Sequence, residues 1–215
     1  MTTKLFLPLL FIAHLSFGQT GIETIISAST EKFKSDRINS SSNKTFNKRI
    51  SLKEINKSNS QIDIRLYKLF SLSNTKSLRR IYLDKKSNWK AEAFDEWNNP
   101  VVTIKKYKVS TDLGFDSLIL KLLSYNILIL PTQDSLRSKM KKETGEIYEG
   151  YPVYSTMRVN DGEGYSIEIK IGNKFRIYEF SSPDLYSKYY TDVNEFKDFL
   201  EIVNIFYNYL KPNSR

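Results

Sequence analysis

The middle of the chain alternates between apolar and polar side chains. Residues 62–67 place Ile or Leu at the even positions and Asp, Arg or Tyr at the odd ones, a period of two that predicts a β-strand with one buried face. Three further segments of this kind follow, at 78–84, 88–95 and 101–109. Because turn-forming residues separate them, the pattern predicts a four-stranded antiparallel meander.

Two later segments have the period of an amphipathic helix. Apolar residues recur every three or four positions at 113–125 and again at 193–210, which predicts a helix with one apolar stripe in each. Asp192 and Glu195 form a variant capping box that is expected to begin the second helix. Residues 133–142 predict an additional, basic helix.

The last third of the chain predicts three more strands, at 151–159, 165–171 and 175–180. The Asn-Asp-Gly-Glu-Gly segment between the first two is expected to form their turn. For the second turn, the pattern favours a three-residue loop at 172–174 over a two-residue loop. The longer loop pairs Ile171 with Phe175 and keeps one face apolar, whereas the shorter loop sets Ile169 opposite Arg176.

Together these elements predict an α+β fold. We expect an antiparallel meander sheet of about seven strands, in one sheet or two pieces, with amphipathic helices at 113–125 and 193–210 packed on one face. The fold should occupy a single domain at 61–215. Residues 19–60 are expected to form a basic, Ser- and Asn-rich lead-in that is partly flexible, with a short helix at 22–34.

The first 18 residues have the three parts of a secretion signal. Lys4 precedes an apolar run, and small residues precede the expected cleavage between Gly18 and Gln19. The run is shorter than the roughly 20 residues that span a bilayer, and no later segment predicts a transmembrane helix. The sequence therefore predicts an exported bacterial protein, either periplasmic or secreted.

The composition excludes several kinds of chemistry. The chain has no cysteine, and its single histidine, His14, lies in the predicted signal. Disulfides, thiol nucleophiles and imidazole-based catalysis are therefore not expected in the mature protein, nor are a metal site or a cofactor. The formal charge is +9, which favours anionic surfaces as partners. Nucleic acid is not an expected partner of an exported protein.

Basic and aromatic side chains are interleaved in two segments near the middle of the chain. The candidate binding residues are Tyr82, Lys85, Lys86, Trp89, Lys90, Lys105, Lys106, Tyr107 and Lys108. Such surfaces bind anionic polymers through charge and stacking, although lysines also protect the edges of sheets. We therefore interpret the chain as a non-catalytic protein that binds a partner or an anionic envelope component.

Two alternatives stay open. Glu143, Glu146 and Glu149, or the Asp95-Glu96 pair, supply acids for a carboxylate-dependent hydrolase, for example on glycans, provided that two acids face each other. The other alternative is an inhibitory or structural envelope protein. Four S-x-x-K matches lack the companion motifs of Ser/Lys enzymes, and the chain has no Gly-rich phosphate loop.

Overall fold

The computed structural model describes residues 33, 35, 42–70, 75–98 and 100–212. The predicted signal segment, its cleavage between Gly18 and Gln19, and the predicted helix at 22–34 apart from Phe33 lie outside the described residues.

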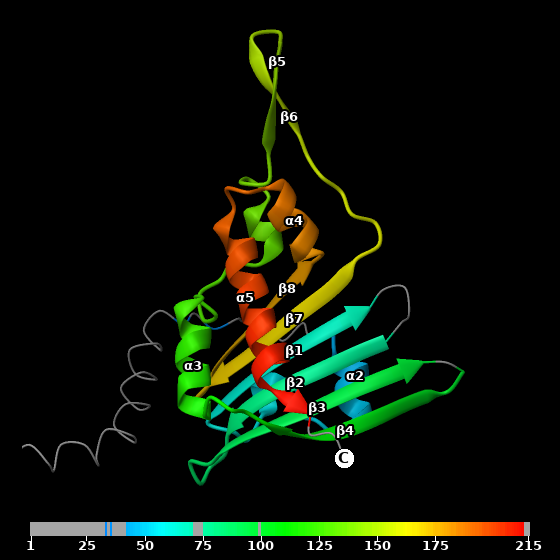
Figure 1. Ribbon diagram of the computed structural model, residues 1–215, viewed down its shortest axis with the longest axis vertical. Coiled ribbons are helices and arrows are strands. Elements are labelled where there is room, and N and C mark those ends of the chain that lie inside the picture. The colour runs from blue at the N-terminus through cyan, green and yellow to red at the C-terminus, as the bar shows by residue number, and fades with distance from the viewer. Residues whose placement is uncertain (1–32, 34, 36–41, 71–74, 99, 213–215) are drawn as a thin grey trace, which may run out of the picture.

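A seven-stranded antiparallel sheet forms the centre of the fold, in the order β8-β7-β1-β2-β3-β4-β9 (Figure 1). Its strands are β1 (Ile62–Phe70), β2 (Thr75–Leu83), β3 (Trp89–Asn98), β4 (Val102–Ser110), β7 (Glu163–Ile171), β8 (Lys174–Ser181) and the short β9 (Lys211–Pro212). A separate hairpin consists of β5 (Lys142–Tyr148) and β6 (Tyr151–Ser155). The helices are α2 (Lys44–Arg49), α3 (Phe115–Ser124), α4 (Pro183–Tyr189) and α5 (Asn194–Tyr209), with 3-10 turns η1 (Ile55–Lys57) and η2 (Gln133–Leu136). The predicted α+β class is confirmed.

The sheet is assembled from two parts of the chain. Strands β1 to β4 form the predicted meander. The β7–β8 hairpin then adds to the open edge of β1, where Ile62 lies opposite Ile171. This long-range pairing makes one continuous sheet and places β1 near its middle.

Helices α3 and α5 cover one side of the sheet, here called the helix face, as predicted (Figure 1). Their apolar stripes pack on the aliphatic positions of β1, β2 and β7. The ring of Phe199 in α5 stacks on Phe180 in β8, with 4.1 Å between centroids. The predicted capping box is wrong: Val193 is the N-cap of α5 and makes no side-chain cap hydrogen bond. Glu195 is instead paired with Lys139.

A second layer covers the opposite side, here called the N-terminal face. Phe46 of α2 packs on Tyr67, Leu78 and Phe94, and Ile55 of η1 is fully buried. The first six residues of β1 are therefore buried on both faces, so their polar side chains are buried as well as their apolar ones.

The predicted basic helix at 133–142 is wrong. The structure has the short η2 turn at Gln133–Leu136, and strand β5 begins at Lys142. Leu136 is the one buried residue between 133 and 142, so the segment lacks the apolar stripe that would hold a helix against the sheet.

The predicted pairing of the C-terminal strands is wrong in two respects. Strand β6 pairs with β5 and not with β7, so the 156–162 segment is a connection between them. The turn between β7 and β8 is the two-residue loop, since Ile171 pairs with Lys174 and Ile169 with Arg176.

Arg176 explains why the shorter loop is tolerated. Its guanidinium donates to the carbonyl oxygen of Leu128 at 3.0 Å and lies over the ring of Tyr178 at 5.4 Å. The charge is thus satisfied at the border of the core. Gly172 supplies the left-handed backbone that the tight turn requires, with a φ of 57°.

Candidate functional site

The nine predicted binding residues divide between the two faces of the sheet. Because side chains alternate along a strand, the register places Trp89, Lys105 and Tyr107 on the helix face and Tyr82, Lys90, Lys106 and Lys108 on the N-terminal face. Lys85 and Lys86 are exposed in the turn between β2 and β3. The structure therefore does not bring all nine residues to one surface.

Two of these residues, Trp89 and Lys106, make specific contacts with neighbouring elements. The indole of Trp89 stacks on Phe115 of α3, with 6.2 Å between centroids, and its N–H donates to Asp116 at 3.1 Å. On the opposite face, Lys106 pairs with Glu92 at 2.6 Å. These contacts attach β3 to a helix and β4 to β3, which gives both side chains structural roles.

The N-terminal face carries two rows of charged residues that cross the sheet, here called the charge rows. One row runs from Lys170 through Asp63 and Tyr82 to Lys90. The next runs from Glu168 through Arg65, Arg80 and Glu92 to Lys108. The rows hold five basic and three acidic side chains, so positive charge is in excess.

Asp63 joins the two rows at their centre, since it bonds to arginines of the second row. Its carboxylate accepts hydrogen bonds from Nε and Nη2 of Arg80, both at 2.8 Å, from Nη2 of Arg65 at 2.8 Å and from Ser58 at 2.5 Å. Burial alone would raise the pKa of Asp63, but the hydrogen bonds and charges of the two arginines lower it from 3.8 to about 2. The carboxylate of Asp63 therefore bonds to the guanidiniums of both Arg65 and Arg80, which the strand register places opposite each other.

Arg65 and Glu168 continue this network toward β7. Arg65 donates to Glu168 at 3.3 Å and to the carbonyl oxygen of Lys53 at 2.8 Å. The hydroxyl of Tyr67 donates to Asn47 at 2.9 Å, and burial together with the charge of Glu168 raises the pKa of Tyr67. These bonds hold α2 and the 53–60 segment on the sheet, which is a structural role.

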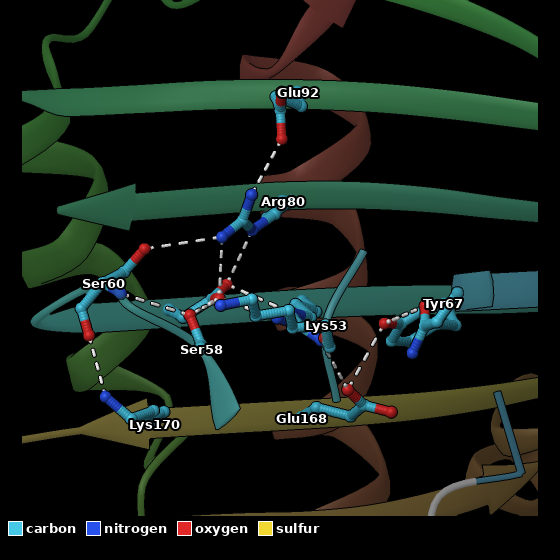
Figure 2. Close-up of polar contacts among 11 residues, drawn as sticks. Lys53, Ser58, Ser60, Tyr67, Arg80, Glu92, Glu168 and Lys170 are labelled. Atoms are coloured by element: carbon cyan, nitrogen blue, oxygen red, sulfur yellow. Dashed lines mark hydrogen bonds and ion pairs between the residues drawn. The ribbon is translucent and has the colours of Figure 1, made fainter. Parts of the chain in front are cut away.

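Lys170, at the end of the first row, is held by a backbone oxygen. The ammonium of Lys170 donates to the carbonyl oxygen of Ser60 at 2.8 Å (Figure 2). Burial lowers the pKa of Lys170, Asp63 partly offsets this effect, and the charges of Arg65 and Lys85 lower the pKa further. The charge of Lys85, in the β2–β3 turn, is the smallest of these influences on the pKa of Lys170.

We call Tyr82, Lys85, Lys90 and Lys170 the cation site. Lys90 is neutralised by Asp84 at 2.8 Å, and the guanidinium of Arg80 lies over the ring of Tyr82 at 3.9 Å. Lys85, exposed in the turn, and Lys170 contribute further positive charge to this site. The sequence pattern identifies three of these residues but not Lys170, because the alternation of 165–171 indicates only which face of the strand is apolar.

A cavity of about 720 Å³ lies elsewhere, between η2, the 156–158 segment, β8 and α4. Two acids line it: Asp134, which pairs with Arg137 at 2.9 Å, and Glu179, which accepts a hydrogen bond from Ser42 at 2.7 Å. Neither acid comes from the residues that the sequence singled out. Glu143, Glu146 and Glu149 instead lie on or beside the exposed β5–β6 hairpin.

The described residues show neither a metal-binding cluster nor a membrane-spanning helix. Within those ranges, no group of three or more acidic, His or Cys side chains is placed to hold a metal ion. None of the helices in the described part of the chain has the length and apolar composition needed to cross a membrane. Comparisons of the chain with protein-family models, curated proteins and solved structures find no match.

Proposed function

We propose that this protein is a non-catalytic, exported binding protein whose cation site holds an anionic group, a phosphate or carboxylate, of an envelope polymer. The observation that carries the proposal is the excess of positive charge in the charge rows, the first of which ends at Lys170 and Lys90 next to the exposed turn that carries Lys85. An anion stabilises uncompensated positive charge. Burial lowers the pKa of Lys170, and a bound anion would raise it.

The position of the cation site favours a polymer over a small enclosed ligand. Lys85 and Lys90 are exposed and Tyr82 is half-buried, so a chain can cross the site without entering a cavity. Charge attraction and contact with an aromatic ring are the usual means of holding such chains. Export, which residues 1–18 predict, would bring the domain into contact with polymers of this kind.

Binding of inorganic polyphosphate and of polyglutamate, measured by isothermal titration calorimetry, tests the proposal and distinguishes phosphate from carboxylate recognition. Combining Lys85→Gln with Lys170→Met should lower the affinity for the preferred probe by about tenfold or more and reduce its salt dependence. Lys188→Gln, an exposed lysine in α4, is the control. Equal losses per charge removed at Lys188 and at the cation site would show general attraction to a basic chain and contradict the proposal.

The pH dependence provides a second readout. An anion binds the charged form of Lys170, whose pKa is lowered by burial and by its cationic neighbours. Affinity should therefore begin to fall, as pH rises, below the range in which an ordinary lysine titrates. Lys170→Met should remove this early loss.

The cavity supports a second candidate function, a carboxylate-dependent hydrolase, because Asp134 and Glu179 line the same concavity. Glycan hydrolysis uses two facing carboxyls, and the aromatic side chains of Tyr186 and Tyr190 also line this cavity. Release of reducing ends from peptidoglycan or chitin fragments tests this function. Activity that Asp134→Asn and Glu179→Gln each abolish would support it, and no release of reducing ends would rule it out.

A further inference from the structure

The β5–β6 hairpin projects from the domain beyond α4 (Figure 1). Every residue of β5 is exposed, and large side chains near the tip lie in solvent: Ile147, Tyr148 and Tyr151 are 76%, 69% and 75% exposed. An isolated two-stranded hairpin is marginally stable in water. An arm of this kind, with apolar side chains at its tip, is typical of a segment that docks on a partner.

The charge of the hairpin is opposite to that of the chain as a whole. It carries Glu143, Glu146 and Glu149 against a single basic residue, Lys142 at the start of β5, whereas the chain has a formal charge of +9. Acidic side chains beside the exposed tyrosines disfavour anionic lipid headgroups as the partner. They favour a basic protein surface with an apolar component.

The same chain presents such a surface at the edge of strand β4. One edge of β4 pairs with β3, while β9 pairs with the other edge at Val109 and Ser110. Within the described ranges, 102–108 therefore has an open edge. This segment carries three lysines, at 105, 106 and 108, and lies next to Val101, which is 70% exposed.

We propose that the β5–β6 hairpin of one molecule pairs with the open edge of β4 in a second copy of this chain. Each partner brings an unpaired strand edge, and the backbone hydrogen bonds of an added strand supply the affinity. The glutamates then lie against the lysines of β4, and the exposed tip residues lie against Val101 and Val102. The contact joins two different surfaces. Two copies can therefore form a closed dimer in which the contact is made twice, or further copies can add to form an open assembly.

This inference does not depend on the cation site, because Lys85 and Lys170 take no part in it. The test is the mass of the purified full chain by light scattering and sedimentation velocity, over increasing concentration and at low and high salt. We expect concentration-dependent self-association that high salt weakens. A chain that stays monomeric at all concentrations overturns the proposal.

Charge reversal identifies the two surfaces. Glu146→Lys with Glu149→Lys should weaken self-association by about tenfold or more, as should Lys105→Glu with Lys108→Glu, and mixing these two variants should restore association between them. Asp192→Lys, an exposed acid outside the hairpin, is the control and should have little effect. Self-association that survives both reversals, or two variants that fail to associate when mixed, overturns the proposal.

Replacing the exposed aromatics separates this proposal from membrane docking. Tyr148→Ser with Tyr151→Ser should weaken self-association without changing charge. If the chain instead stays monomeric and sediments with phosphatidylglycerol vesicles in a manner that needs both tyrosines, the partner is a membrane and the proposal is wrong.

Discussion

Replacing Asp63 with asparagine should destabilise the fold strongly, because its carboxylate is the counter-ion of two buried guanidiniums. Asp63 and Arg65 are fully buried and Arg80 is 8% exposed. Removing one partner of a buried charge network costs about 3–5 kcal/mol, since the remaining charges are left uncompensated. The lowered pKa of Asp63 has the same sign and a somewhat smaller size, because the difference between 3.8 and about 2 corresponds to roughly 2–3 kcal/mol.

Urea unfolding followed by circular dichroism at neutral pH measures this effect. Asp134→Asn is the matched control: it removes an exposed ion pair with Arg137, and such pairs contribute about 0–1 kcal/mol. The folded pKa of Asp63 lies below its unfolded value, so its contribution is complete above about pH 4 and is lost as the pH falls toward 2. The gap between wild type and Asp63→Asn should therefore shrink over this interval. A gap below about 1 kcal/mol at neutral pH, or one that does not shrink in acid, would refute the reasoning.

Two further substitutions test the packing. Gly162→Ala should lower the free energy of unfolding by about 1–3 kcal/mol, because the added Cβ would lie 1.7 Å from Oγ of Ser182; adding Ser182→Ala should recover part of the loss in thermal unfolding. Phe199→Ala should cost about 3–5 kcal/mol in the same assay, because its fully buried ring stacks on Phe180, whereas Leu120→Ala, at a half-exposed position in α3, should cost much less. Equal effects at Phe199 and Leu120 would contradict the assignment of α5 to the core.

The cation site shows where sequence reasoning stopped. Lys85 and Lys90 were identified from their place among aromatic residues, a local signal. Lys170 lies in a strand whose alternation predicts one apolar face but says nothing about what covers the polar face. The pairing of β7 with β1 sets Lys170 opposite Asp63, and nothing within the β7 segment specifies that neighbour.

The β7–β8 loop shows a similar limit. The alternation of apolar residues disfavours the two-residue turn, because that turn places Arg176 on the apolar face. The structure satisfies this guanidinium with carbonyl oxygens of Leu128 and Leu130, which are more than 40 residues away in the chain. Whether a charge is tolerated at a core border depends on acceptors that periodicity does not reveal.

The strands of the meander, the amphipathic helices predicted at 113–125 and 193–210, and the lack of any thiol follow from the sequence, because period, turn residues and composition are local properties. The tertiary structure sets which polar residues are buried, because α2 and η1 form a second layer over β1. It also decided which charges meet, since the partner of Arg65 at Glu168 lies 103 residues away in the chain. Electrostatic neighbours follow from strand pairing, and strand pairing is a long-range property of the chain.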